Sequence, residues 1–246
     1  MKYSQILTEI RQKYTDRVLE KQDIEKIAKN IYNIQSEKTL RNIIGILKSN
    51  NIIKEIEKSR YIVSTKLAYE YKGQEREKNI YKLIKTEYPN ISFVVWDTSI
   101  LNEFTLHYVV NNYIIIETEK IAIELVVNLL KTKYLKKYTV ITQDILKYNK
   151  NIYSNTEKLI IVKPLHTRSP LKNKKCITIE KIMLDLYVDE LYIQYQGKEL
   201  ETIYENIFEK YDIDLKRLMK YAEHRTDIKE YKKFMNSLYI PRKYKL

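Results

Sequence analysis

The sequence predicts an α+β protein made of two parts. Three observations carry this prediction: apolar residues recur at helical spacing in much of roughly the first 65 residues, four β-branched runs lie between Ile91 and Val162, and about the last 70 residues return to helical spacing. Alternating strands and helices in the middle of the chain indicate a mixed sheet with helices packed on it. A chain of 246 residues accommodates one large domain or two of ordinary size.

Three short helices are predicted near the N-terminus, the second over about Gln22–Ile31 and the third over Ser36–Ser49. Ser36 is a suitable N-cap for the third helix, and the charge of Glu37 in its first turn suits the helix dipole. The residues expected to face inward are Ile6, Leu7 and Ile10 in the first helix, Ile24, Ile27, Ala28 and Ile31 in the second, and Leu40, Ile43, Ile44 and Leu47 in the third.

Two β-prone runs follow, Ile52–Ile56 and Arg60–Val63, with the polar turn Glu57–Ser59 between them. Such a pattern predicts a β-hairpin. Three helices followed by a hairpin is the element order of a winged helix-turn-helix, in which the third helix enters the DNA major groove. Residues 1–66 are therefore predicted to form a winged helix-turn-helix DNA-binding domain.

The predicted DNA-binding residues lie on the polar side of the third helix and near the tip of the hairpin. Arg can read guanine and Asn can read adenine through paired hydrogen bonds, while Lys, Ser and Thr also suit phosphates. The predicted set is Ser36, Lys38, Thr39, Arg41, Asn42, Lys58 and Arg60. An alternative stays open, in which these residues are simply the solvated face of a small helical domain.

Residues 67–78 are predicted to be a linker, and residues 79–246 a larger mixed α/β domain with a helical C-terminus. A helix after the second strand is expected to bury Ile121, Leu125, Val126, Leu129 and Leu130. The expected strands are Ile91–Trp96, Tyr113–Glu117, Tyr138–Thr142 and Leu159–Val162. The expected C-terminal helices are Thr178–Asp189, Leu200–Tyr211, Leu215–His224 and Lys229–Leu238.

Composition narrows the classes of protein. The formal charge of +13 gives weak support for a nucleic-acid partner, because the abundant Ile, Lys, Asn and Tyr are also residues that AT-rich codons specify. No apolar run reaches the roughly 18 residues of a membrane span, and charge near the N-terminus argues against a signal peptide. The single cysteine fits a reducing cytoplasm. The three histidines have no metal-ligand spacing, so we predict neither a metal nor a cofactor.

The order of these parts resembles the AbiEi-type antitoxins and regulators of type IV toxin–antitoxin and abortive-infection systems. The resemblance lies in Ser92–Thr98, Leu159–Leu165 and Ile177–Leu186, and most specifically in Thr178–Leu186, where Thr begins a helix that carries Leu-Asp-Leu. It implies a cytoplasmic protein whose N-terminal domain binds operator repeats in double-stranded DNA and represses its own operon. It further implies a nucleotidyltransferase-like C-terminal domain that acts as antitoxin against a nucleotidyltransferase toxin. A winged helix that reads an inverted repeat needs two copies on the DNA, where they can meet as a homodimer.

The sequence departs from a catalytic nucleotidyltransferase. Such an enzyme needs a Gly-Ser turn and two carboxylates that hold Mg²⁺ and the triphosphate. None of Gly45, Gly73 and Gly197 precedes Ser, and Asp97 supplies one carboxylate alone. We therefore expect a fold without that catalysis. Two alternatives remain: a nucleotidyl- or phosphoryl-transferring enzyme with a degenerate site around Asp97, Glu117 or Glu119, and a winged-helix regulator without a toxin partner.

Three further segments contain candidate functional residues. The loop Lys163–Pro170, which contains His166, is expected to be an exposed polar connection; with Lys172, Lys174 and Lys175 it could instead bind a phosphate or an acidic partner. Asp185 and Asp189 are expected to cap and solvate a helix rather than to act as ligands. The basic tail from Lys229, with Tyr231, Tyr239 and Tyr244, could grip nucleic acid or be a solvated helix and frayed end.

Overall fold

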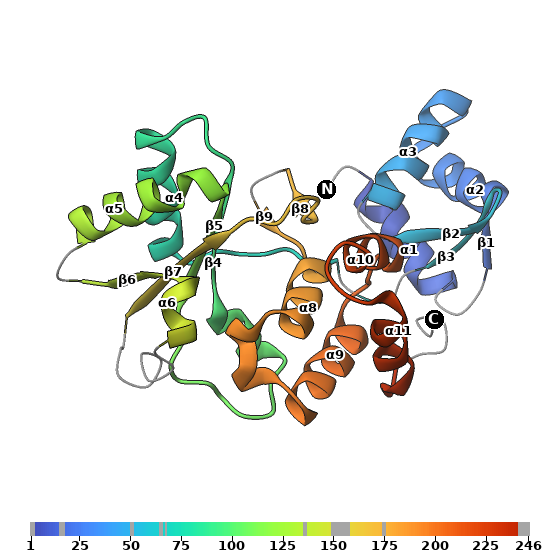
Figure 1. Cartoon of the computed structure of the whole chain (residues 1–246). Helices are drawn as coiled ribbons and strands as arrows, with labels where there is room; N and C mark the ends of the chain where they lie inside the picture. The colour runs from blue at the N-terminus through green and yellow to red at the C-terminus, as the bar shows by residue number, and fades with distance from the viewer. Residues whose placement is uncertain are drawn as a thin grey trace. The chain divides into compact units, whose positions relative to one another are not determined.

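The computed structural model describes residues 3–14, 18–49, 52–63, 66, 68–134, 137–148, 158–173 and 176–240 (Figure 1). Within these ranges helices combine with several sheets, which confirms the predicted α+β class. The chain divides into two compact units. Unit 1 comprises Met1–Tyr69 with Lys210–Asp212, and unit 2 comprises Glu70–Glu209 with Ile213–Leu246.

Unit 1 contains three helices and a three-stranded antiparallel sheet in the order β1-β3-β2. The three helices and the hairpin lie where the sequence predicts them. The first strand was not predicted; it pairs Val18 with Ile62 and Glu20 with Arg60. The elements are α1 (Ser4–Tyr14), β1 (Val18–Glu20), α2 (Lys21–Tyr32), α3 (Glu37–Ser49), β2 (Ile53–Glu57) and β3 (Arg60–Val63).

The core of unit 1 forms where the apolar stripes of its helices meet the sheet. Nine of the eleven residues predicted to face inward are buried, and the other two, Leu7 and Ile31, pack half-buried against the same core. A short turn joins α2 to α3. It begins at Asn33, whose φ of 52° is left-handed, and its N–H donates to the Lys29 carbonyl at 2.9 Å. Ile34 then packs on the core, so a helix-ending turn with an apolar contact orients α3.

Unit 2 is built on a four-stranded mixed sheet in the order β4-β5-β7-β6. The edge strand β4 runs antiparallel to β5, whereas β5, β7 and β6 are parallel. All four predicted strands of the mixed sheet are therefore confirmed. They are β4 (Phe93–Asp97), β5 (Ile114–Thr118), β6 (Thr139–Thr142) and β7 (Leu159–Pro164).

One face of this sheet packs apolar side chains against α4 (Glu75–Glu87) and α5 (Ile123–Tyr134). The prediction for α5 was wrong in part, because Ile121 is 86% exposed and Leu125 is 49% exposed. Ile121 belongs to a preceding 3₁₀ turn rather than to the helix. The buried stripe of α5 is consequently formed by Val126, Val127 and Leu130, with Leu129 partly buried beside it.

The C-terminal part of unit 2 is helical, as predicted. Its helices are α8 (Ile179–Val188), α9 (Lys198–Lys210), α10 (Leu215–Ala222) and α11 (Ile228–Ser237), drawn from orange to red in Figure 1. The smaller elements of unit 2 are η1 (Thr98–Glu103), η2 (Lys120–Ala122), α6 (Gln143–Tyr148), β8 (Leu171–Lys172), β9 (Cys176–Ile177) and η3 (Glu190–Tyr195). None of the helices that the structure describes is both long and apolar enough to cross a membrane.

The chain is fixed to unit 2 before α4 begins. The Tyr71 hydroxyl donates to the Glu77 carboxylate and accepts a hydrogen bond from the backbone N–H of Asp97 at 3.0 Å. Gln74 caps α4 through a reciprocal capping box with Glu77. Residues 70–74 of the predicted linker are thus clamped to the end of β4, and residues 75–78 are helical.

Candidate functional site

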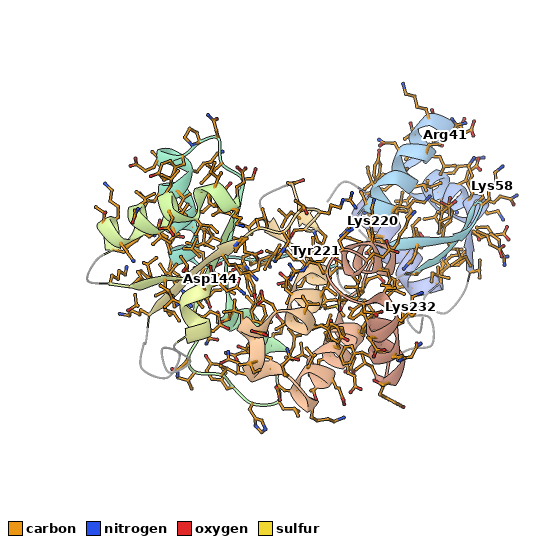
Figure 2. The ribbon with its side chains drawn as sticks, in the orientation of Figure 1. Arg41, Lys58, Asp144, Lys220, Tyr221 and Lys232 are labelled. Atoms are coloured by element: carbon orange, nitrogen blue, oxygen red, sulfur yellow. The ribbon has the colours of Figure 1, made fainter. Side chains whose placement is uncertain are left out.

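Helix α3 has two chemically different faces. Leu40, Ile43 and Leu47 are at most 3% exposed and face the core of unit 1. Of the predicted DNA-binding residues on this helix, Lys38, Arg41 and Asn42 are exposed and Thr39 is half-buried, while Ser36 is exposed immediately before the first turn. The structure therefore brings these predicted residues together on one outward surface, with Arg41 labelled in Figure 2.

Two cations surround Glu37 at the start of α3. Its Oε1 atom lies 2.9 Å from Nη2 of Arg41 and 3.2 Å from Nζ of Lys21, which comes from the first turn of α2. Hydrogen bonds from Arg41 and then Lys21 lower the pKa of the Glu37 carboxyl below its usual value. Lys38 forms no ion pair with any residue that the structure describes. The sequence predicted that the charge of Glu37 lies in the first turn of the helix, where it suits the helix dipole. It did not predict the contacts with Arg41 and Lys21.

The hairpin between β2 and β3 presents the other two predicted residues. Lys58 and Ser59 form its two-residue turn, in which Ser59 has a left-handed φ of 64°. Arg60 is exposed and pairs with Glu57 at 2.6 Å. Lys58, labelled in Figure 2, is exposed and forms no ion pair with any residue that the structure describes. The turn therefore contributes one uncompensated cation, at Lys58.

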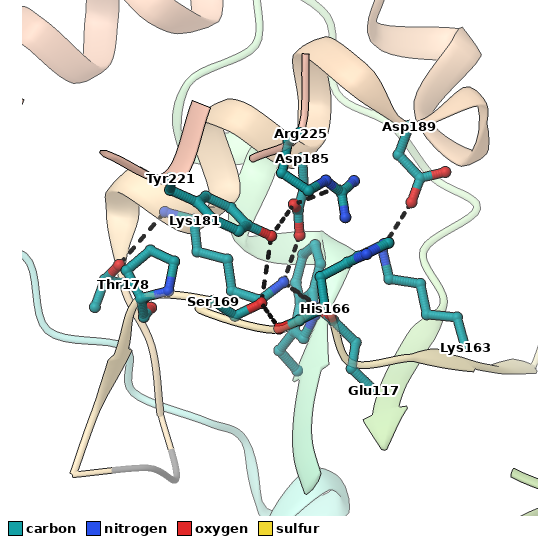
Figure 3. Close-up of polar contacts among 12 residues, drawn as sticks. Glu117, Lys163, His166, Ser169, Thr178, Lys181, Asp185, Asp189, Tyr221 and Arg225 are labelled. Atoms are coloured by element: carbon teal, nitrogen blue, oxygen red, sulfur yellow. Dashed lines mark hydrogen bonds and ion pairs between the residues drawn. The ribbon is translucent and has the colours of Figure 1, made fainter. Parts of the chain in front are cut away.

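Unit 2 contains a second group of charges, buried beside the other face of its sheet (Figure 3). At its centre Nζ of Lys181 lies 2.7 and 2.8 Å from the two carboxylate oxygens of Glu117. The same ammonium group also donates to Asp185. Asp185 in turn accepts a hydrogen bond of 2.9 Å from the Tyr221 hydroxyl and lies 3.9 Å from the guanidinium of Arg225.

A second branch of the buried group joins β7 to the end of α8. Nζ of Lys163 donates to Oδ2 of Asp189 at 2.8 Å, and Gln143 donates to Oδ1 of the same carboxylate. Lys163 lies beside Glu117 in the register of β5 and β7, which links the two branches. We call the six charged residues the buried charge cluster; they are Glu117, Lys163, Lys181, Asp185, Asp189 and Arg225.

The buried charge cluster holds three carboxylates against three cations, each less than a tenth exposed. Burial acts to raise the pKa of Asp185, but Lys181, Lys163 and Arg225 outweigh it and hold that pKa well below its usual range. Burial acts to lower the pKa of Lys163, but nearby carboxylates raise it above its usual value. Three carboxylates thus face three cations, so the cluster is charge-balanced and suited to joining elements of the fold.

The prediction that Asp185 and Asp189 solvate their helix was wrong. Asp185 is 1% exposed and Asp189 is 8% exposed, because each meets a buried lysine. The capping half of the prediction holds for Asp189, whose Oδ1 atom accepts from the backbone N–H of Leu191 at 3.1 Å. The signal for burial was present in the sequence, since Lys163 and Asp185 each interrupt an otherwise apolar run.

The loop that contains His166 is less exposed than expected. Thr167 and Arg168 are exposed, but His166 is half-buried, and burial followed by the nearby Arg225 lowers its pKa. Ser169 donates to the His166 carbonyl at 2.8 Å. The cations proposed to extend this loop do not form a described cluster with it, since Lys172 pairs with Glu70 and residues 174–175 lie outside the described residues.

The carboxylates of the alternative catalytic site do not meet. Glu117 lies opposite Val94 in the antiparallel register, three residues before Asp97, so Glu117 and Asp97 project from opposite faces of the sheet. Asp97 pairs with Arg76 at 2.6 Å, and Glu119 accepts from the backbone N–H of Ser92. Among the residues that the structure describes, no group of three or more His, Cys, Asp or Glu side chains could hold a metal ion.

The C-terminal tyrosines are divided between core and surface. Tyr231 is fully buried and its hydroxyl lies 3.2 Å from that of Tyr204, so it cannot stack on a base. Tyr239 is 93% exposed. Tyr244 lies outside the described residues. The alternative in which the tail grips nucleic acid therefore loses one of its three aromatic residues.

Comparison with known proteins relates the chain to a family. No curated protein and no solved structure matches the chain. The model of a family of unknown function, DUF6577, matches residues 39–240, a range that begins within α3 and includes most of the chain. The protein therefore belongs to the DUF6577 family.

Proposed function

We propose that unit 1 is a winged helix-turn-helix that binds double-stranded DNA, and that the chain is a transcriptional regulator that represses its own operon. The observation that carries this proposal is the outward surface of α3, where Lys38, Arg41 and Asn42 stand together while Leu40 and Ile43 face the core. A helix that is firmly packed on one side and displays donors on the other is suited to the major groove.

The order of elements in unit 1 supports the proposal. A helix, a strand, two helices and a hairpin follow one another, and the strand completes a three-stranded antiparallel sheet with the hairpin. Residues 33–36 join α2 to α3, a connection of the length used between the two helices of a helix-turn-helix. The hairpin turn with Lys58 then corresponds to the wing.

In this proposal α3 lies in the major groove, with Arg41 and Asn42 at base edges. Lys38 and Lys58 contact phosphates, and Arg60 supports the wing by its ion pair with Glu57. Base contacts fix the sequence that is bound, whereas phosphate contacts fix register and supply most of the salt dependence. The two kinds of contact therefore predict different consequences of mutation.

A gel-shift titration with the DNA upstream of the gene tests the proposal. We expect Arg41→Ala to cost about 1–3 kcal/mol of operator binding and to relax specificity at one base pair. Lys58→Ala should weaken binding to all duplexes alike and reduce the salt slope by about one. Lys13→Ala on α1 is the matched control, because it removes an exposed cation from a different helix. Unchanged binding by both Arg41→Ala and Lys58→Ala contradicts the proposed interface.

We further propose, from the resemblance to AbiEi-type proteins, that unit 2 is the antitoxin of a type IV pair and acts without catalysis. The pairing of Glu117 with Lys181 and of Asp97 with Arg76 supports a non-catalytic role, since neither carboxylate is left open for a metal and a triphosphate. Co-expression with the product of an adjacent nucleotidyltransferase gene tests this. Restored growth is the expected result; continued toxicity leaves a regulator without a toxin partner.

A further inference from the structure

The ion pair between Glu37 and Arg41 lies on the surface of α3 that the proposed function places against DNA. The two residues are one helical turn apart and their side chains are 61% and 71% exposed, respectively. Lys21, on α2, binds the same carboxylate oxygen. A residue outside α3 therefore helps to hold the pair in position before any DNA arrives.

The contacts of this pair leave one acceptor open. Arg41 and Lys21 both donate to Oε1 of Glu37, and Oε2 accepts from no residue that the structure describes. Arg41 has five N–H donors and uses Nη2 for Glu37. The pair thus presents guanidinium donors directly beside a free carboxylate oxygen. Its lowered pKa keeps the Glu37 carboxyl ionised and able only to accept at neutral pH.

This arrangement complements one kind of base pair. Across the major groove a G·C pair displays the guanine N7 and O6 acceptors and then the cytosine N4 amino donor. An A·T pair displays an acceptor, a donor and an acceptor, followed by the thymine methyl group. Two donors followed by an acceptor, as Arg41 and Glu37 offer, match the G·C order and mismatch the A·T order.

We propose that Glu37 is a specificity-determining residue, and that Glu37 and Arg41 together read a single G·C base pair. Arg41 donates to guanine N7 and O6, and Oε2 of Glu37 accepts from the N4 amino group of cytosine. This inference rests on the proposed DNA binding by unit 1 and adds to it a base identity and a residue outside the predicted set. The carboxylate also repels the phosphates of any duplex. Only a duplex with cytosine at this position offsets that repulsion with a hydrogen bond, so the carboxylate weakens binding to the others.

Selection of binding sites from randomised duplex DNA, followed by titration of the selected site and its point variants, tests the proposal. The wild-type protein should require a G·C pair at one position, and both Arg41→Ala and Glu37→Gln should lose at least about fivefold of that preference at the same position. Glu37→Gln should also bind non-specific DNA about fivefold more tightly, the effect of removing one close charge in water. Glu9→Gln is the matched control, since Glu9 forms an i,i+4 pair with Lys13 on α1.

The double variant Glu37→Gln/Arg41→Ala separates a joint contact from two independent ones. If the two residues read one base pair, the double variant loses less G·C preference than the sum of the losses in the two single variants. If Arg41→Ala loses the G·C preference but Glu37→Gln keeps it, this inference is wrong and the proposed function stands. Failure of the wild-type protein to bind any duplex overturns both. Circular dichroism spectra identical to wild type exclude misfolding of the variants as the cause.

Discussion

Two i,i+4 ion pairs of similar chemistry lie in opposite surroundings. Glu37 and Arg41 on α3 are mostly exposed, whereas Lys181 and Asp185 on α8 are each 1% exposed. Water solvates the first pair almost completely, so its remaining donors and its open carboxylate oxygen can bind a ligand at little cost. The second pair has given up its hydration, so each charge depends on its partner. Exposure, rather than spacing, therefore separates a pair suited to binding from one that holds a fold together.

The largest expected effect follows from breaking the buried pair. Lys181→Met leaves Glu117 and Asp185 buried without their shared cation, and we expect a loss of about 3–5 kcal/mol in the free energy of unfolding of unit 2. Urea titration followed by fluorescence of Trp96 measures it, because this single tryptophan is 1% exposed in unit 2 and donates to Glu117. A loss no greater than that of Lys198→Met, whose ion pair is exposed, would contradict the comparison.

A smaller effect is expected when the buried charge cluster loses a neutral hydrogen-bond donor that contacts it. Tyr221→Phe removes the hydroxyl that donates to Asp185 but leaves Lys181 in place. Hydrogen bonds to charged groups typically contribute about 1.5–3 kcal/mol, so the urea transition should shift less than in Lys181→Met. The Tyr204→Phe variant tests a hydroxyl bonded to a backbone carbonyl instead, and it should cost less than Tyr221→Phe. The reverse order would mean that the charge on Asp185 does not strengthen the bond.

The pH dependence of stability provides a third test. Burial, with help from Arg225, lowers the pKa of His166 in the folded protein below its ordinary value near 6.5. The unfolded chain then binds the proton first, so the free energy of unfolding should fall as pH decreases below about 6.5. His166→Gln should flatten this decline between pH 7 and 5. Asp185, whose folded pKa is lowered, contributes stability that is lost only at more acidic pH, below its unfolded value near 3.8.

The smallest effect is expected from the exposed pair. Glu37→Gln breaks contacts to Arg41 and Lys21 that water already screens, so the thermal midpoint of the protein should stay close to that of wild type. Circular dichroism melting curves measure it, with Glu9→Gln as the control on α1. A marked drop in the midpoint would mean that Glu37 stabilises the fold, which would contradict the comparison with the buried Lys181.

Local patterns predicted most of the elements, and contacts between distant residues account for what was missed. The stripe of Leu40, Ile43 and Leu47 identified the inner face of α3 correctly, because that pattern lies within one helix. Strand β1 escaped prediction because Val18–Glu20 has only three residues, and its partners in β3 lie 40 or more positions further along the chain. The start of α5 was misplaced because Ile121 fits a helical stripe that the preceding turn interrupts.

The candidate sites show the same limit. The exposed set on α3 could be predicted because polar residues alternate with an apolar stripe within a single helix. Lys21 could not be assigned to Glu37, since the turn at Asn33 determines how α2 meets α3. Asp185 stands in an apolar run, which indicates burial, but its cluster includes Glu117 from a strand more than 60 residues earlier. DNA binding itself stays a prediction.

The hydrogen bonds of Tyr71 have a practical consequence for dissecting the chain. This side chain ties the residues before α4 to the end of β4. Unit 2 accordingly begins at Glu70, ahead of α4 itself. A recombinant fragment that starts there keeps the hydrogen bond between Tyr71 and Glu77. A fragment that starts at residue 79 lacks both residues, so the backbone N–H of Asp97 at the end of β4 loses its partner. Biochemists who want the larger half in isolation should therefore cut ahead of the tyrosine.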